Sequence, residues 1–108
     1  MKERIDADLY AEKAQAHYRL NENDLCEKAV DKALVINPNQ AKANNYKGNI
    51  NLKLKKYPEA ERYYKKAIDL NSNFHSPYLG LGSVYSIQKK YDDAIFYFDK
   101  AKELAPKD

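Results

Sequence analysis

The stretch Tyr78-Leu79-Gly80-Leu81-Gly82-Ser83-Val84-Tyr85, with the residues that follow it as far as Pro106, decides the fold of this chain. Four of its residues recur at intervals of three and four and so share one stripe of a helix: Tyr78, Leu81, Gly82 and Tyr85. A second stripe is formed in the same way by Ala94, Phe98 and Ala101. The spacing predicts two helices that pack face to face with small residues at their closest approach, and Pro106 ends the second helix.

The same pattern returns at a fixed step toward the N-terminus. Small residues stay small, since Gly82 corresponds to Gly48 one step earlier and to Ala14 two steps earlier. Other positions also keep their size class: Ala94 with Ala60 and Cys26, Ala101 with Ala67 and Ala33, and Phe98 with Tyr64 and Val30. Agreement in residue size at a fixed period indicates internal repetition.

The order of a large aromatic residue, Leu-Gly, Tyr, a small residue, Phe, Ala and Pro resembles the tetratricopeptide repeat, a helix-turn-helix unit of about 34 residues. The resemblance covers all but a lead-in at 1–6 and divides the rest into repeats at 7–40, 41–74 and 75–108 of one domain. It implies an all-α fold, a right-handed superhelical solenoid. We expect helices at 7–20, 24–36, 41–54, 58–70, 75–88 and 92–104, with Asp24, Pro58 and Asp92 opening the second helix of each repeat and Asp92 capping its helix.

Composition limits the classes of function. A net charge of +3, from 19 Lys and Arg against 16 Asp and Glu, is only mildly basic, so nucleic-acid binding is the weakest of the candidates. The apolar runs are too short to span a membrane, and no signal-peptide core follows Met1. A single cysteine cannot form an internal disulfide, which favours a cytoplasmic protein.

In proteins that the chain resembles, the first helix of each repeat lines a concave groove that holds peptides. The side chains opposite the packing stripe are Asp8, Ala11, Gln15 and Arg19 in the first repeat, Lys42, Asn45, Asn49 and Lys53 in the second, and Ser76, Leu79, Ser83 and Ile87 in the third. Asn45 and Asn49 each offer a donor and an acceptor to a peptide bond, and Lys42 and Lys53 would favour an acidic side chain beside them. A merely solvated polar face is the alternative.

One activity implied by the resemblance fits poorly. Family members that hold the carboxylate terminus of Hsp70 or Hsp90 use a clamp of Lys and Asn from the first repeat, Asn from the second, and Lys and Arg from the third. Here Ala11 stands where the first Lys is expected, and no Lys or Arg occurs between Phe74 and Gln88. A co-chaperone-type adaptor is therefore a minor alternative.

The last helix has an excess of apolar residues. Ile95-Phe96-Tyr97-Phe98 are consecutive and cannot all face one core, whereas the corresponding residues of earlier repeats are more polar. Ile95 and Phe96 therefore predict a second contact surface, either toward more of a longer protein or for self-association. Lys102, which replaces Leu34 and Ile68, is instead the polar change expected of a terminal repeat.

No catalytic chemistry emerges from the sequence. Cys26 occupies a small-residue site and is expected to be a packed structural thiol, and Tyr18 and Tyr46 lie off the main stripe and are expected to be exposed. His17 and His75 have no partners at metal-ligand spacing, and no phosphate-binding glycine loop is present, so we expect neither a metal nor a cofactor. The sequence predicts a non-enzymatic module that binds a protein or peptide partner, or alternatively an assembly or recruiting domain of a larger protein whose activity lies elsewhere.

Overall fold

The computed structural model describes residues 2–106, with side chains from Arg4 onward. The described residues form α-helices joined by short turns, without a β-strand. The helices are α1 (Lys2–Arg19), α2 (Asn23–Ile36), α3 (Ala41–Lys53), α4 (Tyr57–Leu70), α5 (His75–Ile87) and α6 (Tyr91–Leu104). The prediction of an all-α helical repeat fold is confirmed. No helix in this part of the chain is both long and apolar enough to cross a membrane.

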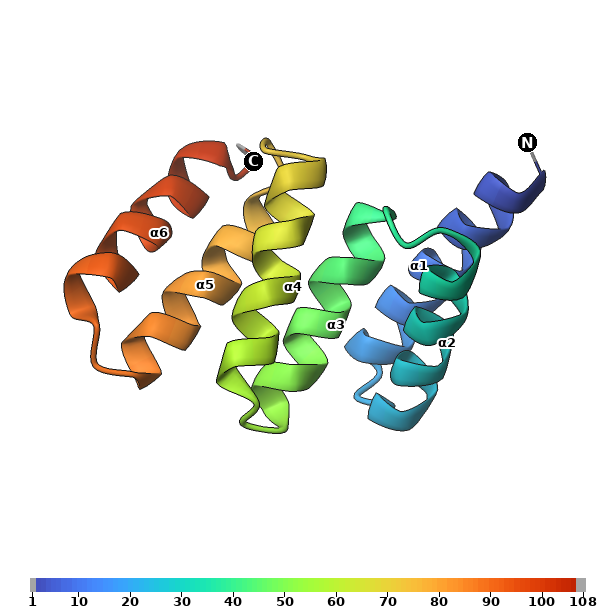
Figure 1. Cartoon of the computed structure of the whole chain (residues 1–108), viewed down its shortest axis with the longest axis horizontal. Coiled ribbons are helices and arrows are strands. Elements are labelled where there is room, and N and C mark those ends of the chain that lie inside the picture. The colour runs from blue at the N-terminus through green and yellow to red at the C-terminus, as the bar shows by residue number, and fades with distance from the viewer. Residues whose placement is uncertain (1, 107–108) are drawn as a thin grey trace.

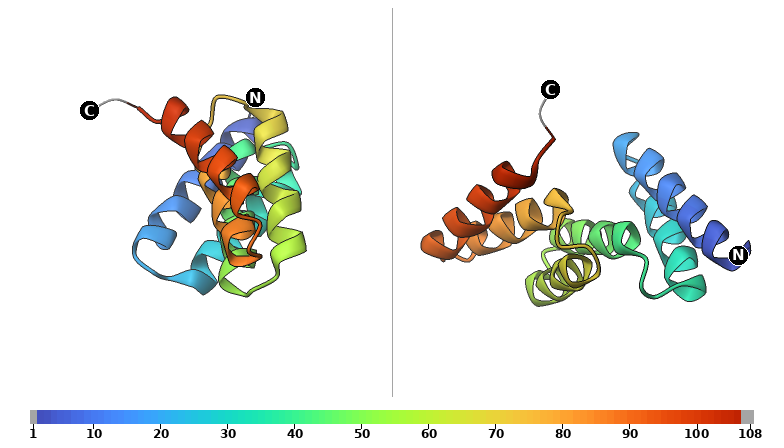
Figure 2. Two further views of the ribbon diagram at one scale, coloured as in Figure 1. Left: turned by 90° about the vertical axis from the view of Figure 1, so that its left-hand side faces the viewer. Right: turned by 90° about the horizontal axis from the view of Figure 1, so that it is seen from above.

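The six helices form three antiparallel hairpins that stand side by side in the order of the sequence (Figure 1). The row is 42 Å long and 28 by 25 Å across. Figure 2 shows the same row from two further directions, with α4 on one side of α3 and the α5–α6 hairpin beyond it. Each hairpin therefore contacts only its neighbours in the row, as in a solenoid.

The turns inside the three hairpins share one backbone conformation. Asn21, Lys55 and Lys89, which occupy the same position in successive repeats, all have a positive φ of 61 to 63°. In each turn the next residue donates its N–H to a carbonyl five positions back, as Lys90 does to Tyr85 at 2.8 Å. This pattern ends the first helix and directs the chain into the second.

The second helices begin slightly before their predicted starts because these turns, and not side-chain caps, set the boundary. The capping residue of α6 is Lys90, without a side-chain hydrogen bond, so the prediction that Asp92 caps this helix is wrong. Asp92 lies in the first turn of α6, and Pro58 lies in the first turn of α4, where its missing donor costs no hydrogen bond. At the other end of the chain, α1 begins at Lys2 and not at residue 7.

The connections between repeats are held by one side chain at a shared repeat position. The Asn44 amide donates to the Pro38 carbonyl oxygen at 3.0 Å, and the Tyr78 hydroxyl donates to the Ser72 carbonyl oxygen at 3.0 Å. Asn44 and Tyr78 differ in size but are one repeat length apart, as are their acceptors. Asn44, a polar residue in the apolar stripe of α3, thus holds the turn between the first two repeats.

Each of the two contacts between successive repeats pairs a tyrosine with a smaller residue, but the tyrosine lies on a different helix in each. Between the first and second repeats, Val30 of α2 packs in one cluster with Tyr46 of α3. Between the second and third, the equivalent residues are Tyr64 of α4, which is fully buried, and Gly80 of α5. A Cβ on Gly80 would overlap the Tyr64 ring. The tyrosine of the first contact belongs to α3, and the tyrosine of the second contact belongs to α4. The side-chain volume at the two contacts is therefore similar, while the surface that the first helices expose differs.

Candidate functional site

The first helices α1, α3 and α5 line a groove with a hollow of about 370 Å³. Gly80 is part of its lining, and the fully buried Tyr64 ring occupies the space that a side chain on Gly80 would take. Its lining consists of Tyr18, Arg19, Asn45, Tyr46, Asn49, Leu52, Tyr64, Ser76, Leu79, Gly80 and Ser83. The volume is that of a site for a few side chains of a ligand.

A buried hydrogen bond orients Asn49 at the floor of the groove. The Tyr64 hydroxyl donates to Asn49 Oδ1 at 2.5 Å. Burial raises the pKa of Tyr64 well above its ordinary value, so its hydroxyl remains a donor at neutral pH. Because the Asn49 oxygen is occupied, its amide N–H groups are left to face a ligand.

Asn45, one turn earlier on α3, carries an unused acceptor. Its side chain is 3% exposed, and Asn45 Oδ1 has no hydrogen-bond partner among the described residues. A buried polar atom without a partner is costly and needs an explanation such as water or a ligand. Of the two amides, Asn49 is half-buried and can contact a ligand, whereas Asn45 Oδ1 is enclosed by the protein.

Two tyrosines form the wall of the groove at the first repeat. The rings of Tyr18 and Tyr46 lie 5.2 Å apart between centroids, and Lys53 Nζ lies 4.2 Å from the centroid of the Tyr18 ring. Burial raises the pKa of Tyr46, and the nearby Arg19 guanidinium opposes that rise. This wall is therefore aromatic, neutral and adjacent to positive charge.

Of the two predicted basic residues of the second repeat, Lys42 is neutralised by an ion pair, whereas Lys53 contacts only neutral groups among the described residues. Lys42 Nζ lies 2.5 Å from Glu12 Oε1 on α1. Lys53 donates to Asn23 Oδ1 at 3.0 Å while it packs on Tyr18. Arg19 lines the hollow and forms no ion pair in the described part of the chain, so it places accessible positive charge at the end of α1.

The structure brings half of the predicted groove residues around one hollow and leaves the others outside it. Those that line the hollow are Arg19, Asn45, Asn49, Ser76, Leu79 and Ser83. Outside it lie Asp8, which accepts a hydrogen bond from Gln40, and Gln15, Lys42, Lys53 and Ile87. The prediction that Ala11 lines the groove is wrong, because Ala11 is fully buried against Ala33 and Ala43 and cannot face a ligand.

Sequence reasoning missed the aromatic residues of the groove. Tyr18, Tyr46 and Tyr64 line the hollow, and the prediction that Tyr18 and Tyr46 are exposed is wrong, because both are half-buried and pack on each other. The signal that could have placed Tyr64 against the first helices is the change from Tyr46 to Gly80 at one repeat position, paired with the change from Val30 to Tyr64.

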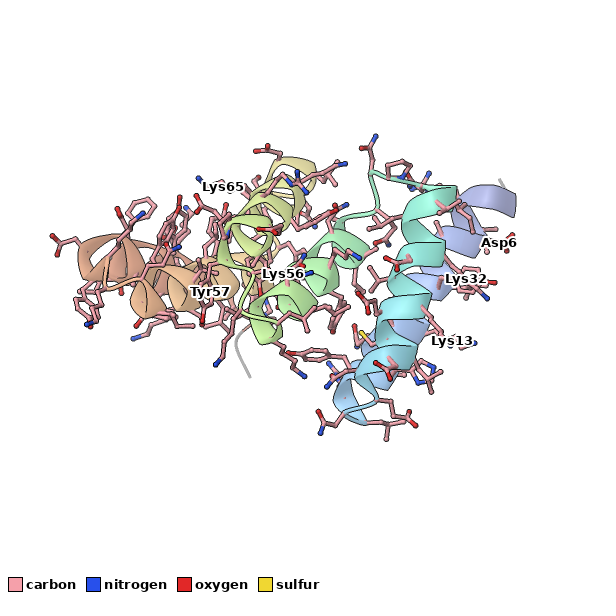
Figure 3. All side chains as sticks on the ribbon, turned by 60° about the horizontal axis from the view of Figure 1, so that its bottom comes forward. Asp6, Lys13, Lys32, Lys56, Tyr57 and Lys65 are labelled. Atoms are coloured by element: carbon pink, nitrogen blue, oxygen red, sulfur yellow. The ribbon has the colours of Figure 1, made fainter. Side chains whose placement is uncertain are left out.

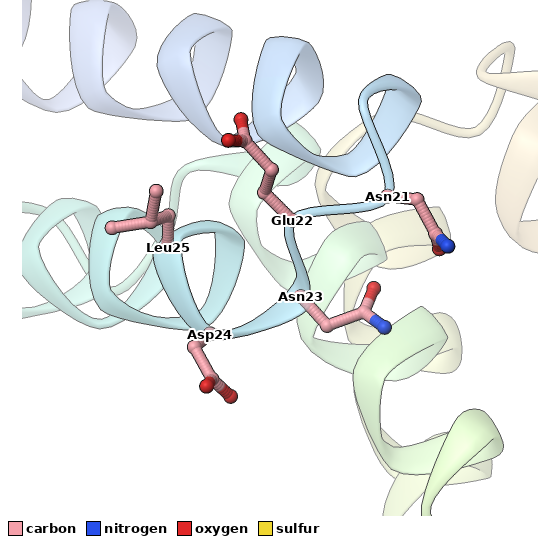
Figure 4. A pocket seen from close by; sticks show the side chains of 5 residues that line it. All are labelled: Asn21, Glu22, Asn23, Asp24 and Leu25. Atoms are coloured by element: carbon pink, nitrogen blue, oxygen red, sulfur yellow. The ribbon is translucent and has the colours of Figure 1, made fainter.

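Other parts of the surface are weaker candidates for a binding site. The hollow at the α1–α2 turn is open, and Figure 4 shows its five side chains, Asn21 to Leu25, pointing in different directions. No group of three or more His, Cys, Asp or Glu residues in the described structure could hold a metal ion. Cys26 is fully buried, and burial raises the pKa of its thiol.

Ile95 and Phe96, the two residues of the predicted second contact surface, lie in different surroundings. Phe96 lines a hollow between α4 and α6 with Tyr78 and Tyr97, and its ring meets Tyr97 edge to face at 5.2 Å. Ile95 is 57% exposed and does not line that hollow. Ile95 and Phe96 therefore do not line one common hollow.

Comparison with known proteins agrees with this architecture. A tetratricopeptide repeat model matches residues 39–107, and a second tetratricopeptide repeat model matches residues 7–40. The chain therefore belongs to the tetratricopeptide repeat family, with three repeats in its six helices. A search of curated proteins gives no significant match.

Several solved structures share the fold. The second TPR domain of Spaghetti (RPAP3), solved with the HSP90 peptide SRMEEVD, superposes with a TM-score of 0.82 at 16% identity over 96% of each chain. The TPR domain of Arabidopsis OM64 gives a TM-score of 0.83 at 21% identity over 98% of this chain and 88% of that one. MamA gives 0.75 at 25% identity, and its match covers 94% of this chain but 59% of MamA.

Proposed function

We propose that this chain is a non-catalytic interaction module that holds an extended peptide segment of a partner protein in the groove of α1, α3 and α5. The observation that carries the proposal is Asn49 on α3, at the floor of the hollow. Asn49 is half-buried, and its Oδ1 accepts the Tyr64 hydroxyl, which orients its amide N–H groups for a ligand. A peptide carbonyl supplies the matching acceptor.

The rest of the groove defines the ligand further. The part of the hollow that Leu79 and Ser83 of α5 line takes an apolar side chain of the peptide. Arg19, at the other end of the hollow, favours a carboxylate at about 2.7 to 2.9 Å, the range of charge-assisted hydrogen bonds. The ligand is thus a segment with an acidic residue toward α1 and an apolar residue toward α5.

The fold neighbours support a peptide as the class of ligand, because two of them are TPR domains of Spaghetti with the peptide SRMEEVD bound. They do not favour the same peptide for this chain. Helix α5, over His75–Ile87, contains no Lys or Arg to hold a terminal carboxylate. A co-chaperone-type adaptor therefore remains the second candidate, supported by fold alone.

The proposal is tested with a short peptide selected from a random display library against the intact chain, with its affinity then measured by calorimetry for four variants. Asn49→Asp keeps the acceptor for Tyr64 but removes the amide donor, and Arg19→Ala removes the charge. Arg19→Ala is expected to weaken binding about tenfold or more, since a hydrogen bond to a charged group contributes about 1.5–3 kcal/mol. Asn49→Asp is expected to weaken binding about tenfold, because it replaces a donor by a carboxylate that repels the peptide carbonyl oxygen.

The matched controls carry the same chemical changes outside the groove. Asn73→Asp lies in the exposed connection before α5, and Arg62→Ala lies on the exposed face of α4. Both are expected to stay within about twofold of the unchanged chain, as surface substitutions usually do. If the groove variants and the controls bind the selected peptide equally well, the peptide does not use this groove.

A further inference from the structure

The two ends of the row of helices expose surfaces that an adjacent repeat covers inside the chain. The tail face on α6 consists of Ile95, Phe98 and Asp99, which are equivalent to Glu61, Tyr64 and Lys65 on α4 and to Glu27, Val30 and Asp31 on α2. The head face on α1 consists of Leu9, Glu12 and Lys13, which are equivalent to Ala43, Tyr46 and Lys47 on α3. Both faces belong to the repeat register that builds the internal contacts.

The contact between the first two repeats shows what such faces do when they meet. Lys47 of α3 donates to Asp31 of α2 at 2.8 Å and lies 3.9 Å from Glu27. Beside this ion pair, Val30 packs in one cluster with Tyr46. In the contact between the second and third repeats, Lys65 and Leu81 stand at the positions of Asp31 and Lys47, so the ion pair is particular to the first contact.

The head and tail faces repeat the Lys–Asp pair of that contact, while Ile95 replaces its second acidic residue, Glu27. Asp99 is the register equivalent of Asp31, two repeats away, and Lys13 is the equivalent of Lys47. Both are exposed, and neither forms an ion pair with another described side chain. Figure 3 shows Lys13 on the side of the α1–α2 hairpin that faces away from α3.

The apolar residues beside these charges are exposed as well. Leu9 is 60% exposed on the head face, and Ile95 and Phe98 are 57% and 37% exposed on the tail face. Glu12 already pairs with Lys42, so it brings no uncompensated charge to the contact. Apolar surface next to complementary charge is the composition of a specific protein contact.

From these correspondences we infer that the chain stacks head to tail on a second copy of itself, with Lys13 of one copy against Asp99 of the next. The contact joins two different faces, so it does not close in a dimer and continues into longer assemblies. The hollow stays open because α1 lines it with Tyr18 and Arg19, whereas the head face uses other residues of that helix, Leu9, Glu12 and Lys13. Stacking therefore places the grooves of successive copies in a line, which favours partners with several binding segments.

The test is sedimentation equilibrium of the intact chain and of two charge reversals, Lys13→Glu and Asp99→Lys, at concentrations up to on the order of 1 mM, where weak contacts become populated. The unchanged chain is expected to show an average mass that rises with concentration. Each single variant places like charges opposite each other and is expected to weaken association at least about tenfold. An equimolar mixture of the two variants restores opposite charges in both contacts and is expected to associate within about twofold of the unchanged chain.

Lys66→Glu is the control, because it makes the same charge change on an exposed position of α4 away from both faces. A chain that stays monomeric at every concentration would overturn the inference and assign the tail face to a different occupant, such as a further segment of a longer protein. Self-association that neither reversal weakens, or that mixing does not restore, would also overturn it.

Discussion

The ring of Tyr64 on α4 lies against the backbone of Gly80 on α5 and also against that of Gly48 on α3, where a Cβ would stand 2.7 Å from ring atom Cδ1. The ring is fully buried, and its hydroxyl is fixed by Asn49. One side chain thus joins the second and third repeats and supports the floor of the groove.

The first prediction concerns Gly80→Ala. Replacing glycine by alanine inside a helix usually stabilises by about 1 kcal/mol. Here the added methyl group overlaps the fully buried Tyr64 ring, which can move only by breaking its hydrogen bond to Asn49, so we expect a loss of about 1–3 kcal/mol. Urea unfolding followed by circular dichroism measures the change.

Gly82→Ala is the matched control for that substitution. Its Cβ would stand 2.6 Å from Phe98, but Phe98 is 37% exposed and can turn outward. We expect this variant to be at least as stable as the unchanged chain. Equal effects of the two substitutions would show that Tyr64 is not held as tightly as its burial indicates.

The second prediction concerns the αL turn at Lys89. A non-glycine residue with a φ of 63° is strained, and glycine adopts this conformation without a steric penalty. Lys89→Gly is therefore expected to stabilise the chain by about 0.5–1 kcal/mol, although it introduces a flexible residue.

Lys66→Gly is the control, and it is expected to change the free energy of unfolding in the opposite direction. Lys66 is an exposed interior residue of α4, where glycine is expected to destabilise by about 1 kcal/mol. A loss of stability in Lys89→Gly as large as that in Lys66→Gly would contradict the assignment of the turn.

The third prediction concerns acid. The hydrogen bond from Lys65 to Glu61, at 2.7 Å, and a second from the Tyr85 hydroxyl, at 2.9 Å, lower the pKa of Glu61 in the folded chain. A carboxylate with a lowered folded pKa stabilises the fold above its unfolded pKa and loses that contribution as pH falls through the folded value.

Glu61→Gln is therefore expected to be less stable than the unchanged chain at about pH 6 and to lose less stability on going to about pH 3.5. Glu103→Gln is the control, since Glu103 lies 3.7 Å from Lys100 and is exposed to solvent. Parallel pH curves for the unchanged chain and Glu61→Gln, measured by urea unfolding, would argue against this contact.

The fold could be read from the sequence because size classes recur at a constant step, as from Gly82 to Gly48 and from Ala94 to Ala60. The starts of the second helices could not be placed to the residue. They are set by a backbone conformation that Lys55 and Lys89 adopt without any side-chain signal for it.

The candidate site could be read only in part. A helical wheel places Asn49 and Leu79 on the open side of their helices, and both line the hollow. It cannot show which neighbouring helix covers Ala11 or that Glu12, 30 residues away along the chain, pairs with Lys42. Those facts depend on the contacts between repeats, which no single helix contains.

The fourth prediction separates the two candidate functions with the peptide SRMEEVD, which is bound in two of the solved fold neighbours. Helix α5 has no basic residue for its terminal carboxylate, so we expect a Kd weaker than about 1 mM by calorimetry. A Kd near about 1 µM, weakened by Arg19→Ala, would favour the adaptor function instead.

The central claim is that α1, α3 and α5 hold a peptide, and amide chemical shifts of the isotope-labelled chain during titration with the display-selected peptide test it most directly. The account predicts that the largest shifts cluster around Arg19, Asn45, Asn49 and Gly80, with Asn49→Asp reducing the shifts at all four. Shifts confined to the outer faces of α2, α4 and α6 would contradict it.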